Sequence, residues 1–346
     1  MPIRHAIVSR DDSVYECFPD VARTRSGRLL VIYRESDGHQ AREFCRLVVR
    51  ASDDEGETWG ARTVLVATVQ QEGVLLEYNC PRVVQLRDGR LLALCDAFPI
   101  PPGEDFTERH AYTRFWWNTD DGVTWSPEPL ETPVMGVVPD RVVELSSGVW
   151  LLGSHERLAD SGVYRQMVYR STDAGRTWEG PTTICATPEY EACEGSILPL
   201  PDGTLVCYMR ENSGRGLPAL KCLSRDEGRT WEGPYLTLMD GCHRPVAGLL
   251  PSGQVLVTYR HQPGGAGYWA KNLFAYRETV ESALEPQRAR QRGIVLPLDH
   301  DRSEHSDSGY SGWVVLPSGT VFAVQYINDD APLAHIRSYW FTEEDF

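Results

Sequence analysis

Short apolar stretches separated by glycine turns recur along the chain. In residues 21–33, two apolar stretches flank a turn formed by Ser26 and Gly27. Stretches of this kind around an Asp-Gly or Ser-Gly pair are typical of β-hairpins, because glycine readily takes the positive φ of a tight turn. The pattern returns in residues 83–94, 142–152, 197–208, 246–259 and 313–326. The sequence therefore predicts six hairpins.

The spacing of the hairpins leaves room for two further strands after each one. The turn glycines are Gly27, Gly89, Gly148, Gly203, Gly253 and Gly319, and successive ones lie 62, 59, 55, 50 and 66 residues apart. Six units of four antiparallel strands, with hardly any helical periodicity, predict an all-β fold, a six-bladed β-propeller. The one stretch with helical character, residues 280–292, can equally be a long loop.

The sixth unit lacks one strand. After its hairpin it has a single strand-like run, residues 335–341, and then the sequence ends. We expect residues 3–9 to supply the missing strand, because this would join the two ends of the chain and remove an exposed sheet edge. The whole chain, residues 1–346, is therefore predicted to form one propeller domain.

An eight-residue motif, S/N-x-D-x-G-x-T-W, occurs once in each of the first four units. The copies are residues 52–59, 118–125, 171–178 and 224–231. Its Asp can accept hydrogen bonds from the backbone of its own turn, its Gly can take a positive φ, and its Trp can enter the apolar layer. We interpret the four carboxylates as structural, in turns between the third and fourth strands on the outer side of the ring.

Composition and net charge exclude some classes of binding partner. The formal net charge of −15 argues against nucleic acid and against an anionic membrane surface. No apolar run is long enough for a signal peptide or a membrane span. The nine cysteines have no regular spacing, so we expect reduced core thiols in a cytoplasmic protein. Neither a CxxC nor an HExxH motif occurs, and no metal or cofactor is expected.

Charged and aromatic residues gather directly before the first strand of each hairpin and directly after the second. In a propeller, the ends of the innermost strands line the mouth of the central channel, where ligands bind. The residues before the strands include Asp20, Arg82, Glu194, His243, Arg244 and Tyr310. Those after the hairpins include Arg34, Asp37, Asp96, His155, Arg210, Arg260 and Tyr326. Several arginines beside several carboxylates predict a small, polar, anionic ligand.

The four S/N-x-D-x-G-x-T-W copies resemble the Asp box, or BNR repeat, of the sialidase (neuraminidase) superfamily. As a fold, the resemblance covers essentially the whole chain. Sialidases hold a substrate carboxylate with three arginines and use a Tyr–Glu nucleophile couple with an Asp as acid/base. The resemblance implies an exo-acting, retaining glycoside hydrolase that needs no cofactor and cleaves a terminal sugar, which we expect to be acidic.

The resemblance also assigns roles. Tyr310 opens the sixth inner strand, as the nucleophile of the family does, and Glu194 opens the fourth, like the Glu that activates it. Arg210 and Arg244 resemble the second and third arginines, and Asp37 falls in the acid/base loop. Plainer interpretations exist: Tyr310 as a rim aromatic, Glu194 as an ion-pair partner of Arg210 or Arg244, and Asp37 as the cap of a turn.

One departure concerns the first arginine. The family has Phe/Tyr-Arg-Ile-Pro at the first inner strand, whereas this chain has Phe-Pro-Asp-Val, so Asp20 takes the place of the arginine. A carboxylate there would repel an anionic substrate. Either Arg82 or Arg34 then makes the missing contact, or the substrate is not an ordinary sialoside.

Three alternatives to a sialidase-like enzyme stay open. The first is an exo-arabinanase-like hydrolase in which two carboxylates, for instance Asp20 and Glu194, do the work. The second is a polysaccharide lyase. The third is a propeller that binds a glycan or protein without catalysis, because a fold by itself does not decide function.

Overall fold

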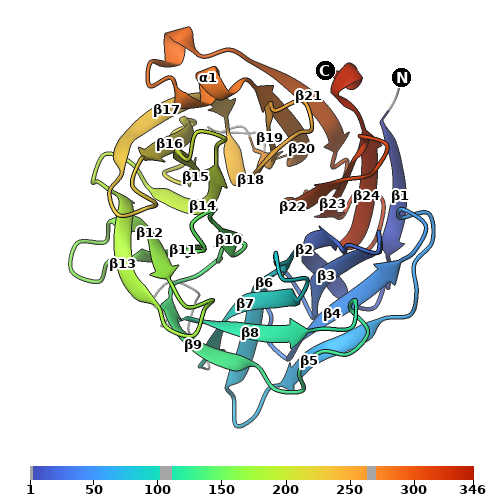
Figure 1. Ribbon diagram of the computed structural model, residues 1–346. Coiled ribbons are helices and arrows are strands. Elements are labelled where there is room, and N and C mark those ends of the chain that lie inside the picture. Colours follow the sequence, from blue (N-terminus) through green and yellow to red (C-terminus); the bar gives the residue numbers. More distant parts are fainter. Residues whose placement is uncertain (1–2, 102–110, 263–269) are drawn as a thin grey trace. The chain divides into compact units, whose positions relative to one another are not determined.

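The computed structural model describes residues 3–101, 111–262 and 270–346. Within these residues the chain forms six four-stranded antiparallel sheets (Figure 1). In five sheets the four strands follow one another along the chain, as the hairpin pattern predicted. The prediction of a six-bladed β-propeller is confirmed. The chain divides into two compact units, which are described separately, and the prediction of a single domain stays a prediction.

Unit 1 comprises Met1–Pro139 and Asp301–Glu343 and contains three sheets. The first consists of β2 (Tyr15–Arg23), β3 (Leu29–Ser36), β4 (Phe44–Ser52) and β5 (Thr63–Val69). The second consists of β6 (Leu75–Gln85), β7 (Leu91–Ile100), β8 (Tyr112–Asn118) and β9 (Leu130–Met135). The third consists of β22 (Ser308–Val315), β23 (Val321–Ile327), β24 (His335–Phe341) and β1 (Arg4–Ser9). Because β1 pairs antiparallel with β24, the N-terminal strand completes the last sheet, as predicted.

Unit 2 comprises Asp140–His300 and Glu344–Phe346 and contains the other three sheets. The first consists of β10 (Val143–Glu144), β11 (Trp150–Arg157), β12 (Tyr164–Ser171) and β13 (Glu179–Ala186). The second consists of β14 (Ala192–Pro199), β15 (Leu205–Glu211), β16 (Pro218–Ser224) and β17 (Glu232–Asp240). The third consists of β18 (Cys242–Leu249), β19 (Val255–His261), β20 (Asn272–Glu278) and β21 (Gly293–His300).

The stretch with helical character forms little helix. It contains α1 (Val280–Leu284) and one 3-10 turn (Arg288–Arg290), and a second 3-10 turn lies near the end of the chain (Glu343–Asp345). The Thr279 side chain caps α1 by accepting a hydrogen bond from the Ser282 backbone N–H. The rest of residues 280–292 is loop, so both interpretations of this stretch hold in part.

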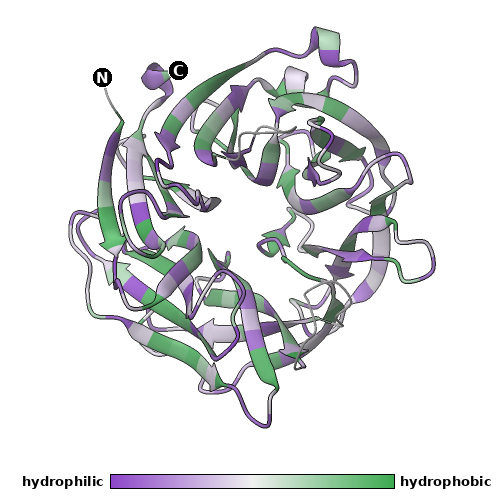
Figure 2. Cartoon of the chain, turned by 180° about the vertical axis from the view of Figure 1, so that it is seen from behind, coloured by the Kyte–Doolittle hydropathy of each residue, from purple (hydrophilic) through white to green (hydrophobic). Residues whose placement is uncertain are grey.

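The core of each unit lies between the faces of neighbouring sheets. In unit 1, Val21 and Val31 of β2 and β3 pack in one cluster with Phe322 and Val324 of β23. Hydrophobic stretches run along the strands of the sheets (Figure 2). All nine cysteines are buried and none is in a disulfide, as expected of core thiols. Over the three described ranges, no helix is both long and apolar enough to cross a membrane.

The Asp-box turns have the structure that their sequence predicted. In the first copy, the Asp54 carboxylate accepts hydrogen bonds from the backbone N–H of Thr58 (2.9 Å) and from the hydroxyls of Thr58 (2.5 Å) and Ser52 (2.7 Å). These bonds lower the pKa of Asp54 to about 2, the Thr58 hydroxyl contributing most. A Cβ on Gly56 would lie 2.4 Å from the Phe322 ring, so only glycine fits. The carboxylate is therefore structural, bound within its own turn between β4 and β5.

Candidate functional site

Each innermost strand is kinked near its start by a residue other than glycine with positive φ. In β2 this residue is Phe18, with φ 55°, and in β22 it is Tyr310, with φ 49°. We call the six equivalent residues the kink residues: Phe18, Cys80, Val138, Glu194, Arg244 and Tyr310. In five of the six sheets the strand register shifts at this point, and Val138 lies just ahead of the short β10. Positive φ is costly for such residues, and this kind of strain gathers at functional sites.

The second strand of each hairpin places one side chain opposite the residue before the kink. Arg34 pairs with Cys17 in this way, and Arg210 pairs with Cys193. We call the six equivalent residues the facing residues: Arg34, Asp96, His155, Arg210, Arg260 and Tyr326. All six were predicted site residues, and the structure shows that they share one place in the repeat.

Asp20 holds strands of unit 1 together. Its carboxylate is fully buried, accepts a hydrogen bond from the Val83 backbone N–H at 3.0 Å, and lies 3.3 Å from the Arg82 guanidinium. Arg82 in turn donates to the Ser311 carbonyl at 3.2 Å. Asp20 and Arg82 thereby link β2, β6 and β22. The repeat also shows that the kink residue of the first sheet is Phe18, two positions before Asp20.

The Arg34 guanidinium likewise forms its hydrogen bonds with other groups of the protein. Its guanidinium is fully buried, donates to the Glu77 carboxylate and to the Asn79 side-chain oxygen (3.0 Å), and lies 4.6 Å from the centre of the Phe18 ring. A second nitrogen of the guanidinium donates to the backbone carbonyl of His39. Arg34 therefore anchors the loop after β3.

Asp96 is a fully buried carboxylate on β7. Its Oδ2 accepts hydrogen bonds from the Asn79 amide and from the Val138 backbone N–H, both at 3.2 Å. Its Oδ1 has no hydrogen-bond partner among the residues that the structure describes. Burial raises the pKa of Asp96 to about 6. This carboxyl group can therefore exchange a proton near neutral pH.

Asp37 caps the loop that follows β3. Its Oδ1 accepts hydrogen bonds from the backbone N–H groups of Arg42 (2.9 Å) and Glu43 (3.1 Å), and its side chain is exposed. These bonds agree with the plainer of its two interpretations, the cap of a turn. Its assignment as acid/base stays a prediction.

An aromatic cluster surrounds Tyr310 in unit 1. The Phe18 ring lies 4.9 Å from the Tyr310 ring and 5.4 Å from the Tyr326 ring, measured between centroids. The His39 ring meets Phe18 edge-on at 5.3 Å. Sequence reasoning placed Tyr310 and Tyr326 at the site but did not select Phe18 or His39, because a lone Phe and a loop His carry no motif.

Asp307, just before β22, organises this cluster. Its carboxylate accepts hydrogen bonds from the Tyr15 hydroxyl, the Tyr326 hydroxyl (3.0 Å) and His39 Nδ1 (2.6 Å). Burial, together with the Asp307 charge, raises the pKa of Tyr15 far above its usual range. Tyr15 therefore stays a neutral donor. Sequence reasoning placed Asp307 among the residues before the sixth inner strand but assigned it no role, and it did not select Tyr15.

In unit 2, Glu194 forms an ion pair with Arg210. Glu194 Oε1 lies 3.0 Å from Arg210 Nη1, and their side chains are 6% and 16% exposed. The Glu194 backbone N–H donates to His155 Nδ1 at 3.2 Å. This confirms one of the two ion pairs that the plainer interpretation of Glu194 predicted. Arg244, the kink residue of the next sheet, is buried.

Two histidines near this ion pair are held neutral. Burial lowers the pKa of His155 to about 4, with the nearby charges of Arg244 and Arg210 acting in the same direction and that of Glu194 against it. Burial, Arg210 and Arg260 lower the pKa of His243 far below its usual range. The Arg260 guanidinium lies 3.0 Å from His243 Nδ1. Arg210 thus pairs with Glu194, and the charges of Arg244 and Arg260 act on the histidines near this pair.

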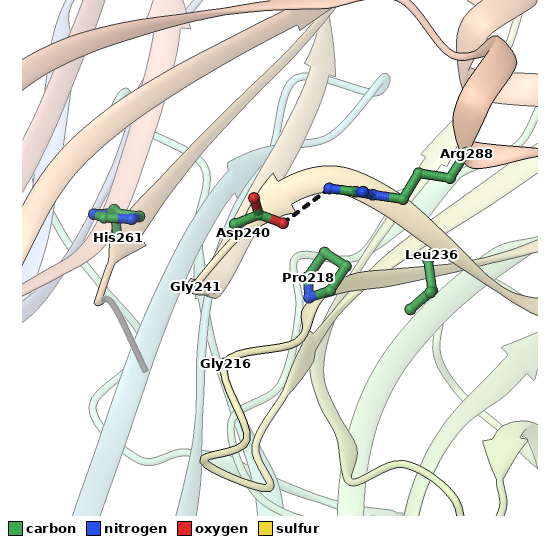
Figure 3. A pocket seen from close by; sticks show the side chains of 7 residues that line it. All are labelled: Gly216, Pro218, Leu236, Asp240, Gly241, His261 and Arg288. Carbon is green, nitrogen blue, oxygen red and sulfur yellow. Dashed lines mark hydrogen bonds and ion pairs between the residues drawn. The ribbon is translucent and has the colours of Figure 1, made fainter. Parts of the chain in front are cut away.

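A pocket of about 480 Å³ lies elsewhere in unit 2. Its lining residues are Gly216, Pro218, Leu236, Asp240, Gly241, His261 and Arg288 (Figure 3). Arg288 and Asp240 face each other across it, with Nη2 and Oδ1 3.1 Å apart. No predicted site residue lines this pocket. Across the described part of the chain, no three His, Cys, Asp or Glu side chains gather into a possible metal site.

Six four-stranded antiparallel sheets define a β-propeller, and four of these sheets carry an Asp-box turn between their last two strands in the chain. A model of the BNR repeat-like domain family matches residues 27–290, and the chain belongs to this family. No curated protein sequence matches the chain.

Solved structures share the fold at low sequence identity. A protein of unknown function from Dyadobacter fermentans is 20% identical, with a TM-score of 0.78 over 98% of both chains. The intramolecular trans-sialidase from Ruminococcus gnavus is 13% identical, with a TM-score of 0.71 over 99% of this chain and 98% of the other. An α-L-arabinanase from Penicillium chrysogenum is 15% identical, with a TM-score of 0.67 over 100% and 99%. The chain thus has a fold that glycoside hydrolases use.

Proposed function

We propose that this protein is an exo-acting glycoside hydrolase that cleaves a terminal acidic sugar. The observation that carries the proposal is that Glu194, Arg244 and Tyr310 are all kink residues. They hold the same strained backbone position in three different sheets, although they lie far apart along the chain. Strain of this kind persists where the surrounding structure enforces it and is common at active sites. The sialidase resemblance assigned Tyr310 and Glu194 to catalysis and Arg244 to binding of the substrate carboxylate.

The proposed chemistry is retaining. The Tyr310 oxygen bonds to the anomeric carbon as the glycosidic bond breaks, a general base takes the phenolic proton, and an acid of the site protonates the leaving oxygen. The resemblance gives the role of this base to Glu194. Water then attacks the same carbon and gives a proton to the conjugate base of that acid, the bond to Tyr310 breaks, and the general base returns its proton to the Tyr310 oxygen. A neutral nucleophile suits an anionic sugar, because a carboxylate nucleophile would be repelled.

The substrate is proposed to differ from a plain sialoside. Arg82 and Arg34, the two candidates for the missing arginine contact, are both buried against partners of their own, Asp20 and Glu77. The kink of the first sheet carries the apolar ring of Phe18. Two arginines, Arg210 and Arg244, would then hold the carboxylate, without a counterpart of the family's first arginine.

The alternative with paired carboxylates is less well supported. It needs Asp20 as a general acid, base or nucleophile, yet this carboxylate is fully buried and already bonded to Val83 and Arg82. Because the Asp20 carboxylate already bonds to these two residues and is buried, it is poorly placed to react with a substrate.

The test is hydrolysis of aryl glycosides by the purified protein, with an α-sialoside, hexuronides and an α-L-arabinofuranoside side by side. We expect release from an acidic glycoside, and loss of more than about a thousandfold in kcat/KM in Tyr310→Phe. Tyr112→Phe, on the partly exposed β8, is the matched control and should retain activity. Activity on the neutral furanoside alone, unchanged in Tyr310→Phe, would refute the proposal. Binding of a sugar acid without turnover would indicate a glycan-binding propeller.

A further inference from the structure

We infer that His39, oriented by Asp307, is the residue that transfers protons at the site in unit 1. The inference rests on the proposed function, because it names the acid that this reaction needs. All the residues involved belong to unit 1: His39 follows β3, Asp307 precedes β22, and Tyr310 lies on β22.

The first support is the geometry of the His39 ring. Its Nδ1 lies 2.6 Å from Asp307 Oδ2, and a carboxylate at this nitrogen favours the tautomer with the proton on Nδ1. The other nitrogen, Nε2, is then available for exchange with a ligand. It has no hydrogen-bond partner among the residues that the structure describes, and the side chain is 47% exposed. The ring is therefore both oriented and accessible.

The second support is that Asp307 is itself held in place. Besides His39 it accepts hydrogen bonds from the hydroxyls of Tyr15 and Tyr326. The side chain of Asp307 is only 14% exposed. A carboxylate with three hydrogen-bond donors holds its position. This is the relation in which a buried Asp orients a catalytic histidine.

The third support is the anchoring of the His39 backbone. The buried guanidinium of Arg34 donates to the His39 carbonyl, and the Ser36 hydroxyl donates to the Gly38 carbonyl at 2.8 Å. Asp37 caps the far side of the same loop through Arg42 and Glu43. The loop is thus preorganised, and Asp37 acts as a positioning residue for His39.

The fourth support is that His39 and the proposed nucleophile, Tyr310, have two ring neighbours in common. The His39 ring is 5.3 Å from Phe18 and 6.4 Å from Tyr326, and both of these rings pack against Tyr310, at 4.9 and 6.4 Å. The four rings therefore form one cluster.

The proton balance is complete. As the Tyr310 oxygen bonds to the anomeric carbon, its phenolic proton passes to the general base, and the doubly protonated His39 ring gives its Nε2 proton to the leaving oxygen and becomes neutral. In the second step His39 Nε2 takes a proton from the attacking water, the bond to Tyr310 breaks, and the general base returns its proton to the Tyr310 oxygen. Histidine suits both steps because it donates and accepts protons near neutral pH.

The decisive experiment varies the leaving group. With an alkyl leaving group, which needs protonation, His39→Gln is expected to lower kcat/KM by about 10² to 10⁴. With a dinitrophenyl group, which leaves without a proton, the loss should be under about tenfold. His5→Gln, at an exposed histidine of β1 in the same unit, is the control and should change neither rate. Equal losses with both leaving groups, or no loss with either, would overturn the assignment.

A second readout is independent of turnover. Ring ¹⁵N spectra should show His39 protonated on Nδ1, and Asp307→Asn should abolish this preference. A neutral His39 ring whose single proton lies on Nε2 would overturn the inference whatever the activity. If Tyr310→Phe is inactive while His39→Gln is fully active on alkyl glycosides, the proposed function stands and the role of His39 falls. If the wild type cleaves no glycoside, the proposed function fails instead.

Discussion

The carboxylate of Asp20 accepts a hydrogen bond from the backbone N–H of Val83, with an Oδ2–N distance of 3.0 Å. The bond joins β2 to β6, the innermost strands of two neighbouring sheets in unit 1. The same kind of bond occurs in unit 2, where Asp140 accepts from the Ile197 backbone N–H at 2.7 Å. Each Asp lies two positions after a kink residue. These carboxylates therefore hold adjacent kinked strands together.

Removal of the Asp20 charge should destabilise the fold. In Asp20→Asn the buried Arg82 guanidinium loses its carboxylate, and breaking a buried pair from one side costs about 3–5 kcal/mol in the free energy of unfolding. Urea unfolding measures this loss. Asp53→Asn, at an exposed carboxylate that pairs with Arg28, should leave the free energy of unfolding nearly unchanged. A variant of wild-type stability that has lost only activity would instead favour Asp20 as a catalytic carboxylate.

Gly312→Ala should be strongly destabilising. A Cβ there would lie 2.2 Å from Asp20 Oδ1 and 2.9 Å from the Val21 backbone nitrogen, distances that real contacts do not show. Overpacking of this kind costs about 1–3 kcal/mol or more, and the displaced Asp20 adds to it. Gly60→Ala, whose nearest neighbour would be 3.5 Å away, is the matched control. Thermal unfolding of both variants checks the prediction, and equal midpoints would contradict it.

Glu16 should make the protein less stable as the pH rises through mildly acidic values. Burial, with a smaller effect of the Glu35 charge, raises the pKa of Glu16 from 4.5 to about 7. Between these values the folded state binds more protons than the unfolded state, so stability falls with rising pH and levels off above about 7. The shift corresponds to a loss on the order of 3 kcal/mol. Urea unfolding at several pH values should show this slope, and Glu16→Gln should flatten it. A slope that Glu16→Gln leaves unchanged would mean that other groups cause it.

Asp37→Asn separates a turn cap from a catalytic acid. As a cap that positions His39, Asp37 should tolerate this change with a loss in kcat/KM below about tenfold and a small loss of stability. As the acid of the reaction, it would cost about 10² to 10⁴ with an alkyl leaving group. The same leaving-group pair used for His39 measures the difference. Arg42→Gln, which changes the same loop and leaves the Asp37 carboxylate in place, is the control.

Much of the fold could be predicted because its signals are local. The Asp-box bonds of Asp54 reach only four residues, to Thr58, and the turn at Gly27 closes within five, from Thr24 to Arg28. Patterns of this range are encoded in neighbouring residues and need no knowledge of the rest of the chain. The strand at the N-terminus was predictable for another reason, since a sheet edge left open in the sixth unit required a partner.

The candidate site was predictable in part. The places of the facing residues, such as Arg210 and Tyr326, follow from counting along hairpins. Which partners those side chains meet does not. Arg34 and Arg82 carry the charges expected of a site, yet both are buried against carboxylates, Glu77 and Asp20, whose positions depend on how neighbouring sheets pack.

What the sequence alone determined is the class of fold: six hairpins, four Asp-box turns and the closing strand, all set by short-range turn chemistry and apolar patterning. What only the tertiary structure decided is which distant side chains meet. His39 and Tyr15 both form hydrogen bonds with the Asp307 carboxylate, although they lie 268 and 292 residues from Asp307 along the chain. No local pattern encodes such a meeting, because it arises only when β22, near the end of the chain, packs beside β2, near its start.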